Sequence, residues 1–146
     1  MAAQRVNEFC PQCNHKGLSV DNATIKSLIS VSLHRVKDVR HRFCAEANCP
    51  IVYYAEDGSE TFYIHDLRER VHQKEHEAED VFVCYCFFHT LGDIQKSVDD
   101  EGRSSIIEDI KAGIQQGHCA CDWRNPQGQC CLGNVMTIVK SQAHNR

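Results

Sequence analysis

The chain has 146 residues, of which 42% are hydrophobic and 25% charged, as is ordinary for a soluble protein of one domain or two very small ones. Its 16 basic and 20 acidic residues give a formal net charge of −4, which does not favour binding to nucleic acid or to an anionic membrane. The segment from Met1 to Phe9 is polar, without the apolar run of a signal peptide or membrane span. We therefore expect a cytoplasmic protein, in which the ten cysteines bind metal rather than form disulfides.

Two close cysteine pairs occupy the N-terminal half. Cys10-Pro11-Gln12-Cys13 is a zinc-knuckle sequence, a tight turn that directs two sulfur atoms at one ion and leaves backbone N–H groups free to bond to them. Cys44 and Cys49 form the second pair, about thirty residues downstream. Four cysteines with no open position favour a closed structural site whose binding energy is folding energy. We expect the four to bind Zn²⁺.

The sequence around these pairs indicates a small antiparallel sheet. Residues 51–54 and 61–64 are aromatic and β-branched, and Glu56-Asp57-Gly58 between them is a hairpin turn signal. Apolar spacings of three and four predict an amphipathic helix over residues 24–39, although the β-branched content leaves a strand open over residues 24–31.

Two charged stretches carry less specific signals. The basic run from His34 to Arg42 is either a nucleic-acid contact or a solvated face, and the acidic total favours the solvated face. Residues 66–80 are rich in both charges and are expected to form a short exposed helix or linker, with a domain boundary near residues 75–80.

The second half is expected to consist of a strand, a cysteine turn and helices. Residues 81–83 form a short apolar strand that leads into Cys84-Tyr85-Cys86. Thr90 with Asp93, and Ser105 with Glu108, have capping-box spacing, so each pair begins a helix. The second of these helices ends near Gly117 and has one face of isoleucines, and a third helix runs from about Leu132 to Ser141. The isoleucine face consists of Ile106, Ile107, Ile110 and Ile114.

The cysteines of this half indicate an iron–sulfur centre. A [2Fe-2S] cluster is held by four thiolates, two at each iron, so a tight pair and a distant pair can converge on it. Cys84 and Cys86 are the tight pair, and the distant pair comes from four later cysteines on a loop containing glycine and proline. Those four are Cys119, Cys121, Cys130 and Cys131.

These motifs together resemble a known family. Cys84-x-Cys86, the helix-turn-helix and the later cysteines are similar to [2Fe-2S] domains of the bacterioferritin-associated ferredoxin type, which close with Cys-x-x-Cys. The run from Cys121 to Cys131, with its Asn-Pro-x-Gly loop, looks instead like the N-terminal part of CopZ-type copper chaperones. The likeness extends to the two N-terminal cysteine pairs and so covers nearly the whole chain.

The resemblance implies the cluster ligands and an α+β fold. It matches Cys84, Cys86, Cys121 and Cys131 to the cluster, with Cys121 preferred because its distance to Asn125-Pro126 matches the family loop. The expected architecture is a zinc-bound antiparallel β unit over residues 1–78, followed by a helical, helix-turn-helix [2Fe-2S] domain over residues 79–146. Full-length CopZ-type chaperones then carry a copper-binding domain with Met-x-Cys-x-x-Cys. This sequence, to Arg146, has no such motif, so copper delivery is not carried over.

Other residues near the cluster are open to two interpretations. Cys119 lies where simpler ferredoxins of this type place their third ligand, but Cys119 and Cys130 are expected to be free thiols, which beside a cluster could bind a soft ion such as Cu(I). His89 and His118 flank cluster cysteines and could ligate as in Rieske centres, but six nearby cysteines make hydrogen-bonding or surface roles the expectation. Trp123 is expected to anchor the loop and cover the cluster.

Three functions from different classes follow. The first is a one-electron carrier in copper or other soft-metal homeostasis, which could reduce the ion for a redox partner or copper-handling partner. The second is a non-redox metallochaperone or scaffold that holds a transiting ion. The third, which the charge disfavours, is a zinc-ribbon regulator that contacts nucleic acid through His34 to Arg42. No catalytic constellation is evident, so an electron carrier is expected rather than an enzyme, with metal-ion reduction as the activity it could have.

Overall fold

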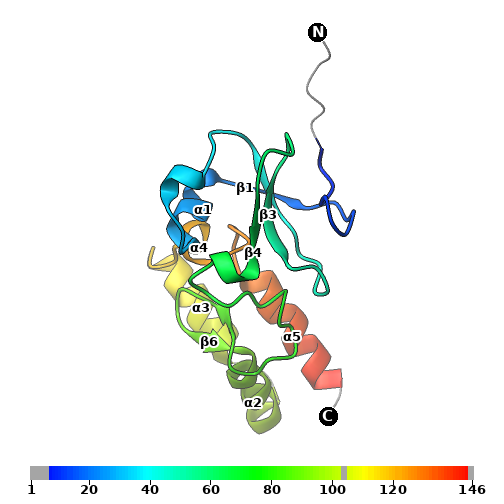
Figure 1. Cartoon of the computed structure of the whole chain (residues 1–146). Helices are drawn as coiled ribbons and strands as arrows, with labels where there is room; N and C mark the ends of the chain where they lie inside the picture. Colours follow the sequence, from blue (N-terminus) through cyan, green and yellow to red (C-terminus); the bar gives the residue numbers. More distant parts are fainter. Residues whose placement is uncertain (1–6, 103–104, 145–146) are drawn as a thin grey trace.

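The computed structural model describes residues 7–102 and 105–144. In this part of the chain the fold is α+β, with an antiparallel sheet at one end of the molecule and helices at the other (Figure 1). None of the helices in these residues is long and apolar enough to cross a membrane. The strands are β1 (Leu18–Val20), β2 (His41–Phe43), β3 (Ile51–Ala55), β4 (Thr61–Tyr63), β5 (Phe82–Cys84) and β6 (His89–Thr90). The helices are α1 (Asn22–Leu28), α2 (Leu91–Glu101), α3 (Ser105–Gln115), α4 (Cys121–Arg124) and α5 (Leu132–His144), with 3-10 turns η1 (Leu33–Arg35) and η2 (Ile64–Asp66).

The larger sheet has the strand order β1-β2-β3-β4, with each neighbouring pair antiparallel. All five residues of β3 are buried, because this central strand is packed on both faces. Its Val52 and Tyr53 join Ile25 of α1 in the main hydrophobic cluster of the N-terminal half. The predicted hairpin over residues 51–64 is confirmed, with a turn through Gly58 at φ +76°.

The predicted helix over residues 24–39 is wrong in extent. Helix α1 ends at Leu28, and the chain then becomes extended, because Ile29 pairs with Leu67 and the Ser30 N–H donates to the Asp66 carbonyl oxygen. Within residues 29–39 only the short η1 turn is helical. The alternative strand over residues 24–31 does not form either. Tertiary pairing with residues 66–67 therefore overrides the local helical spacing.

The helices of the second half agree more closely with those predicted from the sequence. The predicted capping box of Thr90 and Asp93 is confirmed at the start of α2, and α3 ends at Gln115, shortly before Gly117. The predicted Ser105 cap adjoins residues 103–104, which lie outside the described residues, so it stays a prediction. Helix α5 packs along α2 and contacts α3 and β5, which places a second hydrophobic cluster between these helices.

The two ends contact each other directly. The short helix α4 packs against α1, and Thr24 Oγ1 donates a hydrogen bond to the Asp122 carbonyl oxygen. The Tyr53 hydroxyl donates to the Pro126 carbonyl oxygen at 2.5 Å. The hydrophobic clusters nevertheless lie on separate sides of residue 78. The division into domains of 1–78 and 79–146 stays a prediction.

Candidate metal centres

The four N-terminal cysteines come together at one end of the sheet. Their Sγ atoms all lie within 4.8 Å of one another. The Sγ atoms of Cys10 and Cys49 are 3.7 Å apart, and those of Cys13 and Cys44 are 3.6 Å apart. Zn–S bonds of about 2.3 Å in a tetrahedron place sulfur atoms about 3.8 Å apart, so this donor set, here named the Cys10 group, fits Zn²⁺.

Backbone N–H groups surround these sulfur atoms, as a knuckle sequence predicts. The N–H groups of Gln12 and Cys13 bond to the Cys10 sulfur, and the Glu46 N–H bonds to the Cys44 sulfur. At Cys44 burial dominates and raises the pKa of the thiol to about 12, although the N–H bond acts against it. In the metal-free protein this thiol therefore keeps its proton, which a metal ion has to displace.

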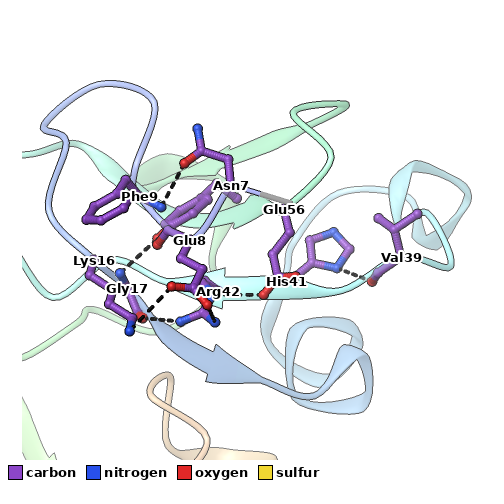
Figure 2. Close-up of polar contacts among 10 residues, drawn as sticks. Asn7, Glu8, Phe9, Lys16, Gly17, Val39, His41, Arg42 and Glu56 are labelled. Carbon is purple, nitrogen blue, oxygen red and sulfur yellow. Dashed lines mark hydrogen bonds and ion pairs between the residues drawn. The ribbon is translucent and has the colours of Figure 1, made fainter. Parts of the chain in front are cut away.

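The first knuckle is held on the sheet by Arg42 of β2 (Figure 2). Its guanidinium donates to the Gly17 carbonyl oxygen at 2.8 Å, to Glu8 Oε1 at 3.3 Å and to Glu56 Oε1 at 2.8 Å. The Gly17 N–H donates to the Tyr54 hydroxyl, which in turn donates to the Glu8 carbonyl oxygen. These contacts fix both ends of the segment that carries Cys10 and Cys13.

A second set of four cysteines meets between β5, α4 and the start of α5, and is here named the Cys84 group. It consists of Cys84, Cys86, Cys121 and Cys131. The Sγ atoms of Cys86 and Cys121 are 3.6 Å apart, and Cys131 packs in the same hydrophobic cluster as Cys84 and Cys121. Within the described residues, only the Cys10 group has three or more sulfur atoms all within 4.8 Å, so the Cys84 group is more extended.

The four cysteines of the Cys84 group differ in the direction in which their pKa values are shifted. The side-chain hydrogen bonds from Cys131 lower the pKa values of Cys84 and Cys121 and raise that of Cys131. Cys86 has its pKa raised to about 12 by burial, against a bond from the Ala120 N–H at 3.1 Å. Cys86 and Cys131 therefore keep their protons more strongly than Cys84 and Cys121, and binding of a metal centre would release these protons.

The other cysteines and the flanking residues lie outside this group. Cys119 and Cys130 are exposed. His89 is paired with Asp109 at 2.7 Å, in keeping with the hydrogen-bonding role expected of it, and His118 is exposed. Trp123 belongs to α4 and is 56% exposed, and its expected role in covering the cluster stays a prediction.

A groove of about 310 Å³ is lined in part by Tyr85, the residue between Cys84 and Cys86. Its lining includes Phe82, Phe88 and Trp123, and the Arg124 guanidinium stacks 5.3 Å from the Phe88 ring centre. Phe88 has φ +61°, a left-handed conformation that is unusual for a bulky residue.

Comparison with known proteins identifies the N-terminal part of the chain. The family model of the CopZ zinc-binding domain matches residues 7–68, which contain the whole Cys10 group. Residues 7–68 are therefore similar to the CopZ-type zinc-binding domain. The copper chaperone CopZ of Archaeoglobus fulgidus is 30% identical over 122 residues, which are 84% of this chain and 57% of that protein. This chain thus spans little more than half the length of that relative.

The likeness to CopZ continues beyond the zinc-binding domain. The X-ray structure of the Archaeoglobus fulgidus CopZ N-terminal domain matches with a TM-score of 0.75 and 27% identity. The match covers 89% of this chain and 96% of that one, so the sheet and the helical end together have the CopZ N-terminal fold. The ligand assignments within the two groups stay predictions.

Two features of the CopZ-type domain and its surroundings were missed from the sequence. The sequence predicts a solvated face for His41 and Arg42, but their side chains are 0% and 13% exposed and pair with Glu60 and Glu56. His41 Nδ1 also faces the Val39 carbonyl oxygen (Figure 2). Lys74 was placed in an exposed linker but is buried. Nothing in the local pattern distinguishes these charged residues from exposed ones, because their partners are distant in sequence.

Proposed function

We propose that this protein takes part in copper handling as a metallochaperone or scaffold that holds a transiting copper ion for a copper-handling partner protein. The observation that carries this proposal is the likeness, over 84% of the chain, to a protein named as a copper chaperone. The presence of two preformed groups of four cysteines in one small chain supports it, because soft thiolate ligands select ions such as Cu(I).

In this proposal the Cys10 group holds a structural Zn²⁺. The tetrahedral spacing of its four sulfur atoms and the backbone N–H groups around them support this role. Cys10, Cys44 and Cys49 are buried, which leaves little room for an exchangeable ligand. Zinc here would stabilise the knuckles and the sheet rather than react.

The Cys84 group is proposed to hold a [2Fe-2S] cluster. Its four sulfur donors are more extended than a single ion requires, which suits a centre with two iron atoms. When bound, such a cluster supplies a one-electron couple. The residues of the chain provide the thiolates, exclude water around Cys84 and Cys131, and donate the Ala120 N–H to the Cys86 sulfur.

The exposed thiols of Cys119 and Cys130 are the proposed contacts for the transiting ion. Each lies within two residues of a member of the Cys84 group, and both are accessible to a partner. The test is a Cu(I) titration against a competing chelator, on protein loaded with zinc and iron under anaerobic conditions. We expect the double variant Cys119→Ser, Cys130→Ser to lose most of the Cu(I) affinity of the native chain. Gln129→Ser, an exposed neighbour, is the matched control.

Equal Cu(I) affinity in the double variant and the native chain would contradict the role of the two thiols. Failure of the native chain to compete with the chelator at all would contradict the copper-handling proposal.

One-electron transfer is the second candidate function. The comparisons support copper handling more directly, and only the proposed cluster in the Cys84 group favours a redox role. Reduction of Cu(II) to Cu(I) by the dithionite-reduced, reoxidisable protein would favour this candidate. A bound cluster that cannot pass an electron to Cu(II) would favour the metallochaperone alone.

A further inference from the structure

A buried lysine lies next to the Cys10 group. Lys74 follows the sheet in the turn formed by residues 72–74, and it is 8% exposed. Its Nζ donates a hydrogen bond to the Glu46 carbonyl oxygen at 2.8 Å. Glu46 belongs to the turn between Cys44 and Cys49. The side chain therefore brings a positive charge to the second knuckle.

This ammonium group has no carboxylate partner within the described residues. The nearby acid Glu75 pairs with Arg70 instead, and the Glu46 carbonyl oxygen that Lys74 contacts is neutral. Burying an ammonium group without a compensating negative charge is costly. Lys74 is thus expected to face an anion.

The thiolates of the Cys10 group are the anions available. Four thiolates with one Zn²⁺ carry a net charge of about −2, which has to be balanced in a buried site. The Nζ atom of Lys74 is held 2.8 Å from the carbonyl oxygen of Glu46, two residues after Cys44, so its charge lies at the second cysteine pair. The side chain of His15 also lies near Glu46, with Nε2 3.6 Å from Glu46 Oε2, but it is exposed to solvent. Lys74 is therefore a buried positive group beside the second cysteine pair of this site.

We propose that Lys74 is the fixed counter-charge of the Cys10 group and stabilises its four cysteines as metal-bound thiolates. The inference rests on the proposed zinc site and adds a positioning residue to it. Lys74 lies outside residues 7–68, the segment matched by the family model. The zinc-binding domain thus depends on a charge supplied by the connection to the helical end.

The test measures Zn²⁺ affinity by chelator competition on the full chain. Lys74→Gln removes the charge and keeps a neutral donor for the Glu46 carbonyl oxygen, whereas Lys74→Arg keeps the charge. We expect Lys74→Gln to weaken Zn²⁺ binding about 10-fold to 100-fold, the range typical of residues that support metal ligands, and Lys74→Arg to restore most of it. Lys140→Gln, at an exposed lysine of α5, is the control for a general loss of charge.

A double-mutant cycle separates charge balance from a packing role. Cys44→His replaces one thiolate with a neutral ligand, so the loss caused by Lys74→Gln should shrink in that background. Equal losses in both backgrounds, or an unchanged Zn²⁺ affinity in Lys74→Gln, would overturn the inference while leaving the zinc site in place. Failure of the native chain to bind Zn²⁺ would instead overturn the proposed function of the group.

Discussion

Backbone donors reach nearly every sulfur atom that we assign to a metal. Backbone N–H groups bond to the sulfur atoms of seven of the eight cysteines in the two groups, namely Cys10, Cys13, Cys44, Cys49, Cys84, Cys86 and Cys121. Such bonds favour the ionised thiolate, the form that binds metal. Cys119 and Cys130 lie exposed outside these arrangements. The distinction between ligand and spare thiol therefore lies in the surroundings of each residue.

Serine substitutions test this distinction. Removal of a ligand opens an iron atom to water, so serine at Cys84, Cys86, Cys121 or Cys131 should bleach or strongly alter the visible spectrum of the loaded protein. Serine at Cys119 or Cys130 should largely spare it. If Cys119→Ser destroys the spectrum while Cys121→Ser leaves it intact, the assignment of Cys121 is wrong.

The pH dependence of zinc binding tests the protonation of the Cys10 group. Burial raises the pKa of Cys44 to about 12 and also raises that of Cys49, so both are neutral thiols in the metal-free protein at neutral pH. Zinc has to displace their protons, and each displaced proton makes the affinity rise about tenfold per pH unit. We expect Zn²⁺ affinity, measured by chelator competition, to rise at least a hundredfold between about pH 6 and about pH 7. An affinity independent of pH would contradict this protonation state.

At the scale of elements, helix α3 positions the Cys84 turn through a close contact. A Cβ atom on Gly113 would lie 2.1 Å from Cζ of Phe87, the residue that follows Cys86. The absence of a side chain on α3 therefore lets the cysteine turn lie against the helix.

Gly113→Ala should displace Phe87 and, with it, the neighbouring ligand candidate Cys86. We expect a loss of about 1–3 kcal/mol in the free energy of unfolding, as for an overpacked core, together with reduced iron content. The matched control is Ala112→Gly, at an exposed position of the same helix, which should cost about 1 kcal/mol through helix propensity without loss of iron. Equal iron content in the two variants would show that the contact does not position the cysteines.

Local signals predicted those elements that rest on neighbouring residues. The capping box at Thr90 and the hairpin through Gly58 depend on residues a few positions apart, and both are confirmed. The helix expected over residues 24–39 ends early because Ile29 pairs with Leu67, a contact that no local spacing indicates. The burial of Lys74 was not predictable for the same reason. Its neighbours in sequence are charged, as in a linker, whereas its hydrogen-bond partner, the Glu46 carbonyl oxygen, is distant in sequence.

At the scale of the molecule, the two cysteine groups lie on separate hydrophobic clusters. The cysteines of the Cys10 group pack with Ile51 and Tyr54 in a small cluster of their own, whereas those of the Cys84 group belong to the helical core. A unit of roughly seventy residues can barely build a sufficient core, so zinc would supply much of the stability of the sheet.

Loss of zinc should therefore unfold the sheet before it alters the other centre. We expect Cys10→Ser to lower the thermal stability of the protein substantially, with little change in the midpoint potential of whatever folded protein remains. Thermal unfolding and redox titration of the same variant measure both quantities. A large shift in potential in folded Cys10→Ser protein would show that the two centres are coupled.

Metal and sulfide analysis of anaerobically purified protein tests the central assignment most directly. The account predicts one zinc, two iron and two sulfide ions per chain, with zinc lost in Cys44→Ser and iron and sulfide lost in Cys84→Ser. A fully loaded, colourless native protein that contains zinc alone would contradict it.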